Sequence, residues 1–232
     1  MIIKVKDAFW PKDNIPVWRY LSFDKFFNFL LYRQIQFTRV SLFTDQNELR
    51  LFGDGSKQTA ASRKNGSRLE QRISSLREST YVSCWSLGRS ESYPLWKIYL
   101  GGSRNGVAIR TTVGRLHHSL KRSDRHFYTA GVQYRDKIFD EEPSDEQIIC
   151  TKTEAYSYER EFRIFTRHSD SDDISKFAPD IVTEAIDLDE MSPRIYVSPF
   201  SSGWFISTVQ DAINYLAPDL SLRVEKSTIQ DQ

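Results

Sequence analysis

An alternating segment in the C-terminal half of the chain reads YEREFRIF, from Tyr158 to Phe165. Successive side chains of a β-strand point to opposite faces of the sheet, so the pattern predicts a strand with two unlike faces. One face carries Glu159, Glu161 and Arg163, and the other carries Tyr158, Arg160, Phe162 and Ile164. The second face is expected to pack on a core, which leaves two carboxylates and a guanidinium on the first.

Further strands and helices are predicted on both sides of this segment. The other predicted strands span residues 15–21, 34–39, 81–86, 107–111, 128–134, 181–188, 194–198 and 222–225. The predicted helices are 23–31 after an N-cap at Ser22, 67–77, a short one from Pro94, 150–155 and 204–216. The order lacks a strict βαβ rhythm and a Gly-rich phosphate loop, which argues against a Rossmann fold. We expect an α+β fold with a mixed, mostly antiparallel sheet flanked by helices.

Length and charge limit the class of protein. The chain has 232 residues, 39% of them hydrophobic, which suffices for one core and predicts a single globular domain over residues 1–232. The 32 Lys and Arg nearly cancel the 31 Asp and Glu, for a net charge of +1. This balance excludes a globally basic nucleic-acid binder, although local basic patches stay open.

Metal sites, disulfides and membrane segments are not expected. The two cysteines, Cys84 and Cys150, form no CxxC pair, and none of the four histidines has metal-ligand spacing. We therefore predict no metal and two reduced thiols, as in a cytoplasmic protein. The first residues lack the apolar stretch of a signal peptide, and no run approaches the about 18 apolar residues of a membrane span.

A basic excursion interrupts the domain at residues 54–78. Between positions 53 and 79 there are six Lys or Arg against three acids, and residues 53–66 are small and polar. The six are Lys57, Arg63, Lys64, Arg68, Arg72 and Arg77. We expect this segment to be mobile, and such segments bind phosphates or simply remain solvated. It supplies an alternative function, a non-enzymatic module that binds nucleic acid or a partner protein through residues 57–77.

Two short motifs point to ligand binding. Arg19 lies between Trp18 and Tyr20 on the first predicted strand, where it can hold a phosphate or carboxylate, or pair with Glu159 or Glu161. Residues 83–86 read Ser-Cys-Trp-Ser, so Ser83 and Trp85 project to one face and Cys84 and Ser86 to the other. Trp96 and Tyr99 follow on the short helix, where they form a pocket wall or part of the core.

The carboxylate pair is the third candidate. Glu159 and Glu161 repel one another, which tends to raise one pKa, while Arg163 tends to lower it. The alternative is an exposed strand face with ion pairs of little energetic value.

The chain resembles a bacterial and phage family, domain-of-unknown-function family 2971, over nearly its whole length. The matching motifs are WRYL (18–21), LFTDQNE (42–48), VSCWS (82–86), LWKIY (95–99), NGVAI (105–109), VQY (132–134), YEREFR (158–163) and VSP (197–199). The family commonly has Asp-Pro where this chain has Asp45-Gln46. This resemblance implies an assignment without an activity.

A second resemblance implies an activity. Arg on the first strand, serines on a middle strand and Glu-x-Glu on a late strand are similar to the Arg–Ser–Glu pattern of ADP-ribosyltransferases, although the usual Ser-Thr-Ser triplet is absent. That family implies a split β-sheet and NAD as substrate. Carried over, Arg19 and Tyr20 bind NAD, Ser83 or Ser86 organises the nicotinamide ribose, Trp96 or Tyr99 stacks on nicotinamide, Glu161 is the catalytic acid and Glu159 acts on the acceptor.

Three readings therefore stay open. The first is an NAD-dependent ADP-ribosyltransferase-like enzyme with an unidentified acceptor, for which a toxin or phage-defence role is an analogy. The second is the binding module of residues 57–77. The third is a magnesium-dependent nuclease in which Asp45 and Glu48 act with Glu159 and Glu161. The first requires these side chains to converge in one pocket, and a structure with Arg19 and Glu161 on opposite faces of the sheet would count against it.

Overall fold

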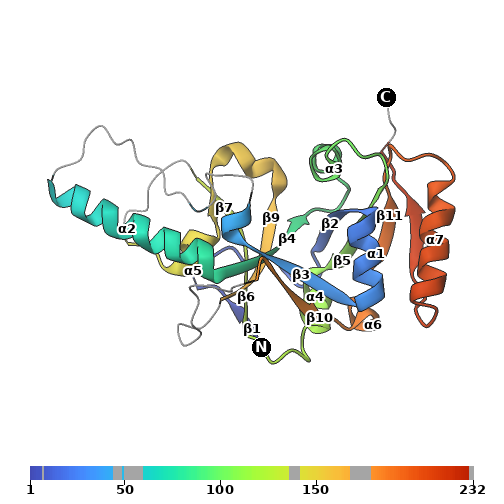
Figure 1. Cartoon of the computed structure of the whole chain (residues 1–232), viewed down its shortest axis with the longest axis horizontal. Coiled ribbons are helices and arrows are strands. Elements are labelled where there is room, and N and C mark those ends of the chain that lie inside the picture. Colours follow the sequence, from blue (N-terminus) through green and yellow to red (C-terminus); the bar gives the residue numbers. More distant parts are fainter. Residues whose placement is uncertain (7, 44–48, 50–59, 136–141, 168–178, 230–232) are drawn as a thin grey trace.

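A computed structural model describes the chain except for residues 7, 44–48, 50–59, 136–141, 168–178 and 230–232, and for residues 60–67 it describes the backbone only (Figure 1). A ten-stranded mixed sheet forms its centre, in the order β1-β6-β9-β4-β2-β5-β11-β12, with β10 and β3 branching from β4. These strands are β1 (Ile2–Lys4), β2 (Pro16–Ser22), β3 (Gln34–Arg39), β4 (Thr80–Leu87), β5 (Gly106–Thr112), β6 (Phe127–Gly131), β9 (Glu161–Arg167), β10 (Ile181–Ala185), β11 (Arg194–Val197) and β12 (Arg223–Lys226). The pairs β1–β6 and β11–β12 are parallel and the others antiparallel, which confirms the predicted fold class.

The sheet is split at one edge of β4. The C-terminal end of β4 pairs with β2, where Ser86 faces Trp18. The N-terminal end of the same strand pairs instead with β3, where Val82 faces Thr38. Between these two pairings β2 and β3 separate, and the opposite edge of β4 runs unbroken beside β9. The split leaves room for side chains in the middle of the sheet.

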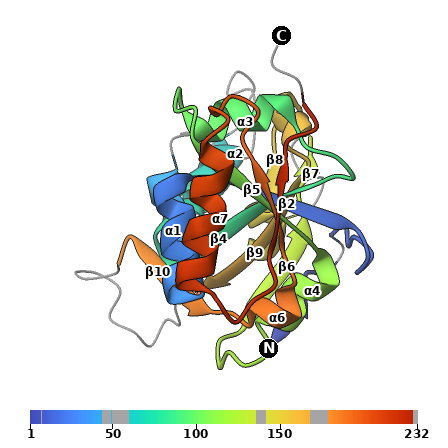
Figure 2. The same ribbon diagram turned by 90° about the vertical axis from the view of Figure 1, so that its right-hand side faces the viewer.

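Helices cover both faces of the sheet (Figures 1 and 2). On one face α1 (Phe23–Tyr32) and α7 (Phe205–Leu216) pack side by side on the main core, together with α4 (Val113–Ser119) and α6 (Leu188–Met191). On the other face α3 (Tyr93–Leu100) covers β2 and β5. The 3-10 turn η1 (Val40–Leu42) and the helices α2 (Ala60–Ser79) and α5 (Asp145–Ile149) lie toward the far end of that face.

The ends of α3 follow from its sequence. The side chain of Ser92 accepts a hydrogen bond from the backbone N–H of Leu95, and Pro94 occupies the first turn, where its missing N–H is harmless. Gly101 ends the helix at φ +55°, a left-handed conformation that glycine adopts without strain. The predicted helix from Pro94 is confirmed, one residue longer at its start.

Several predicted boundaries were wrong. The predicted helix 150–155 is a short strand β8 (Thr151–Lys152), which pairs with β7 (Gln133–Tyr134), followed by the 3-10 helix η3 (Glu154–Glu159). The strand predicted from Tyr158 begins at Glu161, because Arg160 has φ +45° and breaks the extended backbone. The strand predicted to Leu188 ends at Ala185, because Asp187 caps α6. The helix predicted from Ser67 begins at Ala60, and the single strand predicted over residues 128–134 is divided into β6 and β7. The elements β1, α4, α5 and α6 were not predicted.

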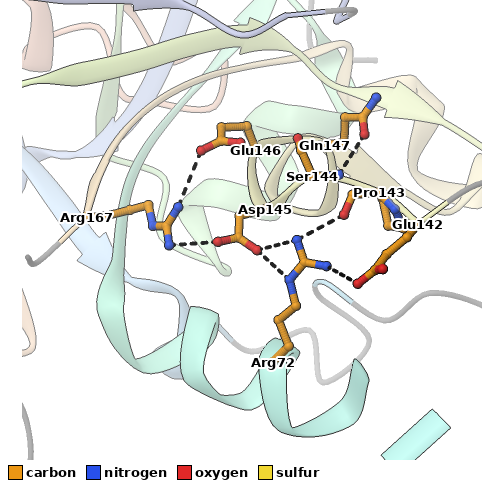
Figure 3. A network of polar contacts seen from close by, with 8 residues as sticks. All are labelled: Arg72, Glu142, Pro143, Ser144, Asp145, Glu146, Gln147 and Arg167. Carbon is orange, nitrogen blue, oxygen red and sulfur yellow. Dashed lines mark hydrogen bonds and ion pairs between the residues drawn. The ribbon is translucent and has the colours of Figure 1, made fainter. Parts of the chain in front are cut away.

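A polar network fastens α2 to the rest of the fold (Figure 3). Asp145, the first residue of α5, accepts from Nε of Arg72 at 2.6 Å and from Nη2 of Arg167 at 2.8 Å. Arg72 also reaches Glu142 at 3.2 Å and the carbonyl of Pro143 at 3.0 Å. The carboxylate of Asp145 thus joins α2, α5 and the end of β9.

We expect Asp145→Ala to lower the free energy of unfolding by about 1–2 kcal/mol, because it removes charge-assisted hydrogen bonds from two arginines at once. Urea denaturation measures the change. The matched control is Glu142→Ala, whose side chain is 85% exposed and is expected to cost less than about 0.5 kcal/mol. Equal losses for the two variants would contradict a central role for Asp145.

Candidate functional site

A pocket of about 680 Å³ opens where β2 and β3 separate over β4. Its walls come from β2, β3, β4, β9, η1, α1, α3 and η3, with further contributions from Phe43 and from Lys152 of β8. Among the lining residues are Arg19, Ser86, Glu159 and Glu161. Four sequence-predicted residues from three distant segments therefore meet in one cavity, of a volume typical for ligand sites.

Arg19 fills the split in the sheet. Its Nη1 donates to Oγ of Ser83 at 2.8 Å, and its Nη2 donates to the carbonyl of Gln36 at 3.0 Å. The guanidinium lies 5.6 Å from the ring centroid of Trp85. Desolvation lowers the pKa of Arg19 from its ordinary value, yet an arginine remains charged. None of these contacts is with Glu159 or Glu161, so the ion pair weighed for Arg19 in the sequence is not formed.

The two predicted serines occupy different places. Ser83 is fully buried, and besides the bond from Arg19 its Oγ accepts from the indole N–H of Trp85 at 3.2 Å. Ser83 and Arg19 thus share one face of the sheet, whereas Glu161, which pairs with Ser86, lies on the other, and Arg19 borders the pocket through the split between β2 and β3. Ser86 lines the pocket and donates to the carbonyl of Glu159 at 2.7 Å. The predicted alternation of β4 is confirmed, since Cys84 and Ser86 face the pocket and Trp85 faces the core.

Of the predicted aromatic residues, Tyr20 and Tyr99 line the pocket and Trp96 does not. Tyr20 and Tyr99 stack with centroids 6.2 Å apart, and Tyr99 is 48% exposed. Burial of its hydroxyl nevertheless raises the pKa of Tyr99 well above its ordinary value. Trp96 is fully buried, packs edge-on against Tyr20 and donates to Glu91 at 3.0 Å. The idea that Trp96 stacks on a ligand was wrong, because the indole faces the core.

Glu161 sits at the first position of β9 and is only 5% exposed. Its two carboxylate oxygens accept from Arg163, at 3.1 Å from Nε and 2.9 Å from Nη2. Burial by itself would raise the pKa of Glu161, but Arg163, Lys152 and a hydrogen bond from Cys84 together lower it. Glu161 is therefore an ionised carboxylate held in a fixed orientation.

Glu159 is the more accessible carboxylate. It ends η3, and its Oε2 accepts from Nζ of Lys152 at 2.8 Å, while the same Nζ lies 3.9 Å from Glu161. Burial raises the pKa of Glu159 above its ordinary value, more than Lys152 lowers it. The pKa values of the two carboxyl groups are thus pushed in opposite directions, chiefly by burial at Glu159 and by Arg163 at Glu161, with repulsion between the two carboxylates a minor cause. Such a separation is typical of an acid–base pair.

Three contributors escaped the sequence reading. Lys152 lies between the carboxylates, and Tyr156 and Tyr158 of η3 add aromatic walls. The sequence analysis did not identify Lys152 as a site residue, because it predicted a helix over residues 150–155. The left-handed Arg160 also places Glu159 outside the strand, so the two glutamates approach the pocket from different elements rather than from one strand face.

Some predicted features lie outside the described residues. Asp45 and Glu48, proposed as magnesium ligands, are among them, as are Lys57 and the side chains of Arg63 and Lys64. Within the described part of the chain, no group of three or more His, Cys, Asp or Glu is placed to hold a metal. Over the same residues, no helix is long and apolar enough to cross a membrane.

No protein-family model matches the sequence, and no curated protein or solved structure matches it significantly. The function must therefore be argued from the pocket itself.

Proposed function

We propose that the protein is an NAD-dependent ADP-ribosyltransferase-like enzyme that works in the cytoplasm, and that it belongs to family 2971. The observation that carries the activity is the meeting of Arg19, Ser86, Glu159 and Glu161 in one pocket at a split in the sheet. In the sheet order β9-β4-β2 the glutamate, serine and arginine strands are adjacent. The resemblance requires these side chains to converge in one pocket, and all four line it.

The charges suit a substrate with a pyrophosphate and a cationic leaving group. Arg19 and Lys25 lie on one side of the pocket, where phosphates would bind, with Arg19 fixed by Ser83. Glu159 and Glu161 lie on another side, near which the nicotinamide ribose would sit. Tyr20 and Tyr99 provide ring faces for a planar base. Lys152 is expected to orient Glu159 rather than to contact NAD.

The chemistry is a heterolytic glycosyl transfer. The bond between C1′ of the ribose and the nicotinamide nitrogen breaks, and its electron pair leaves with nicotinamide, which becomes neutral. Positive charge develops on C1′ and the ring oxygen, and the ionised Glu161 stabilises it. The acceptor attacks C1′ and gives its proton to Glu159, whose raised pKa improves it as a base.

The test is NAD turnover, followed as nicotinamide release with and without cell lysate as acceptor, together with NAD binding by calorimetry. We expect Arg19→Lys to raise KM for NAD by about tenfold with a smaller change in kcat, because a single ammonium replaces a planar fork. The matched control is Lys97→Arg on the exposed side of α3, outside the pocket residues. If the folded wild-type protein shows no NAD turnover and also no NAD binding, the proposal is overturned.

A further inference from the structure

Three arginines lie side by side on the adjacent strands β5, β11 and β12. In Figure 1, β5 and β11 lie at the end of the molecule away from α2. Arg110 of β5 faces Arg194 of β11, and Arg194 faces Arg223 of β12. Facing residues of neighbouring strands point to the same side and are about 5 Å apart. We refer to Arg110, Arg194 and Arg223 as the arginine row.

The arginine row lies on the sheet face opposite α1 and α7. The alternate residues Ile109, Ile195 and Val224 pack in the core beneath those helices, so the arginines point the other way. The side chain of Arg194 is 48% exposed, Arg223 is exposed and Arg110 is partly buried. At least two of the three guanidinium groups are open to an external ligand.

The row has too little negative charge around it. Glu225 is 3.7 Å from Arg194. The side chains of Arg110 and Arg223 form no hydrogen bond or ion pair with the described residues, and Nε of Arg110 is buried without a hydrogen-bond partner. Arg110 contacts the ring of Trp18 at 5.5 Å. Like charges on facing strand positions destabilise a sheet, so folding alone does not account for three in register.

We propose that the arginine row binds the phosphate backbone of a single-stranded nucleic acid. A guanidinium presents a planar fork of donors that matches phosphate oxygens, and a regular line of such forks suits a ligand with repeated phosphates. A single line follows one backbone, whereas a duplex offers two and a membrane surface requires a wider basic face. This surface is distinct from the described part of the basic segment 57–77, which belongs to α2.

The row also points at the pocket. Across the sheet, Arg110 faces Trp18, Trp18 faces Ser86, and Ser86 faces Glu161. Trp18, Ser86 and Glu161 line the pocket, so the arginine row continues the same line of residues outward from it. A strand bound along the row would have to pass the buried Trp18, which is 3% exposed, before one of its nucleotides reached the carboxylates. This assigns nucleic acid as the acceptor class, a step that rests on the proposed function, whereas the binding itself does not.

The binding test uses fluorescence anisotropy with labelled single-stranded DNA and RNA of about 12 nucleotides, without NAD. We expect the triple variant Arg110→Gln, Arg194→Gln, Arg223→Gln to bind at least about tenfold more weakly, and its salt dependence to fall by about 2 in the log–log slope, since each neutralised phosphate of a single strand contributes about 0.7. The double variant Arg194→Gln, Arg223→Gln changes only exposed residues and guards against misfolding. In the double variant the log–log slope of the salt dependence is expected to fall by about two-thirds as much as in the triple variant.

The matched control removes the same number of charges elsewhere. Arg33, Arg122 and Arg125 pair with Asp219, Asp187 and Glu184 respectively, and their triple change to Gln is expected to leave affinity within about twofold, since only the net charge changes. Unchanged binding in the arginine-row variants overturns the proposal. So does loss of binding in Arg68→Gln alone, and so does equal row-dependent binding of polyglutamate or anionic vesicles. Because the assay holds no NAD, failed turnover does not affect its result.

Discussion

Replacing Glu161 by Gln is expected to lower kcat for NAD turnover by about 10²–10³-fold, the range seen when one electrostatic contact to a transition state is lost. The amide has the same shape but no charge, so it cannot stabilise positive charge at C1′. KM should change little, because Glu161 is 5% exposed and acts chiefly when charge develops. Nicotinamide release under saturating NAD measures the effect.

The controls separate catalysis from folding. Glu154→Gln removes an exposed carboxylate from η3, the element that also carries Glu159, and is expected to leave turnover within about twofold. Glu159→Gln is expected to be intermediate, with a loss of about 10²-fold and a flattened acidic limb of the pH–rate profile, since it removes the general base. Full activity of a folded Glu161→Gln protein would refute the proposed role.

Replacing Arg163 by Met is expected to destabilise the fold by about 3–5 kcal/mol, because it leaves the buried Glu161 without its main countercharge. Arg163 is fully buried, and it also donates to the carbonyl of Ile149. Chemical denaturation at pH 7 measures the loss. The matched control is Arg167→Met. Arg167 lies further along β9 on the same face, its side chain is 32% exposed, and its replacement is expected to cost about 1 kcal/mol.

The pH dependence of this deficit has a definite sign. In the wild-type protein the pKa of Glu161 lies below its unfolded value of 4.5, so its stabilisation is present above that pH and is lost as the pH falls through the folded pKa. Without Arg163, burial raises that pKa above 4.5, and protonation relieves the buried charge. The deficit of Arg163→Met should therefore shrink between pH 7 and pH 4.5. A deficit that stays constant would contradict the ion-pair explanation.

Local pattern was enough to predict the strands and helices whose hydrophobic period is clean. β2 and β4 are rich in aromatic and β-branched residues, which favour strands, and α3 carries both a serine cap and a terminal glycine. The face assignment of Ser83 and Ser86 followed from the same alternation. The fold class could be predicted because these signals appear in an order without βαβ repeats.

The details of the site required tertiary information. Arg160 adopts a left-handed conformation that is usually found at glycine, so its residue type did not predict the break between η3 and β9. The helical position of Trp96 placed it among the buried residues Leu95 and Leu100, whereas Tyr99 emerged at the pocket. The arginine row escaped notice because its members are far apart in sequence and become neighbours only through strand pairing.

The split at β4 has a consequence for how the protein becomes active during synthesis. The pocket needs β2, β4 and β9, and the last of these begins at Glu161. Contacts between such distant segments form late, because long loops must close first. A nascent chain that stops before β9 lacks both strand and carboxylate, so it carries no assembled site. An NAD-consuming enzyme built in this way would stay silent until most of its chain has been made and folded.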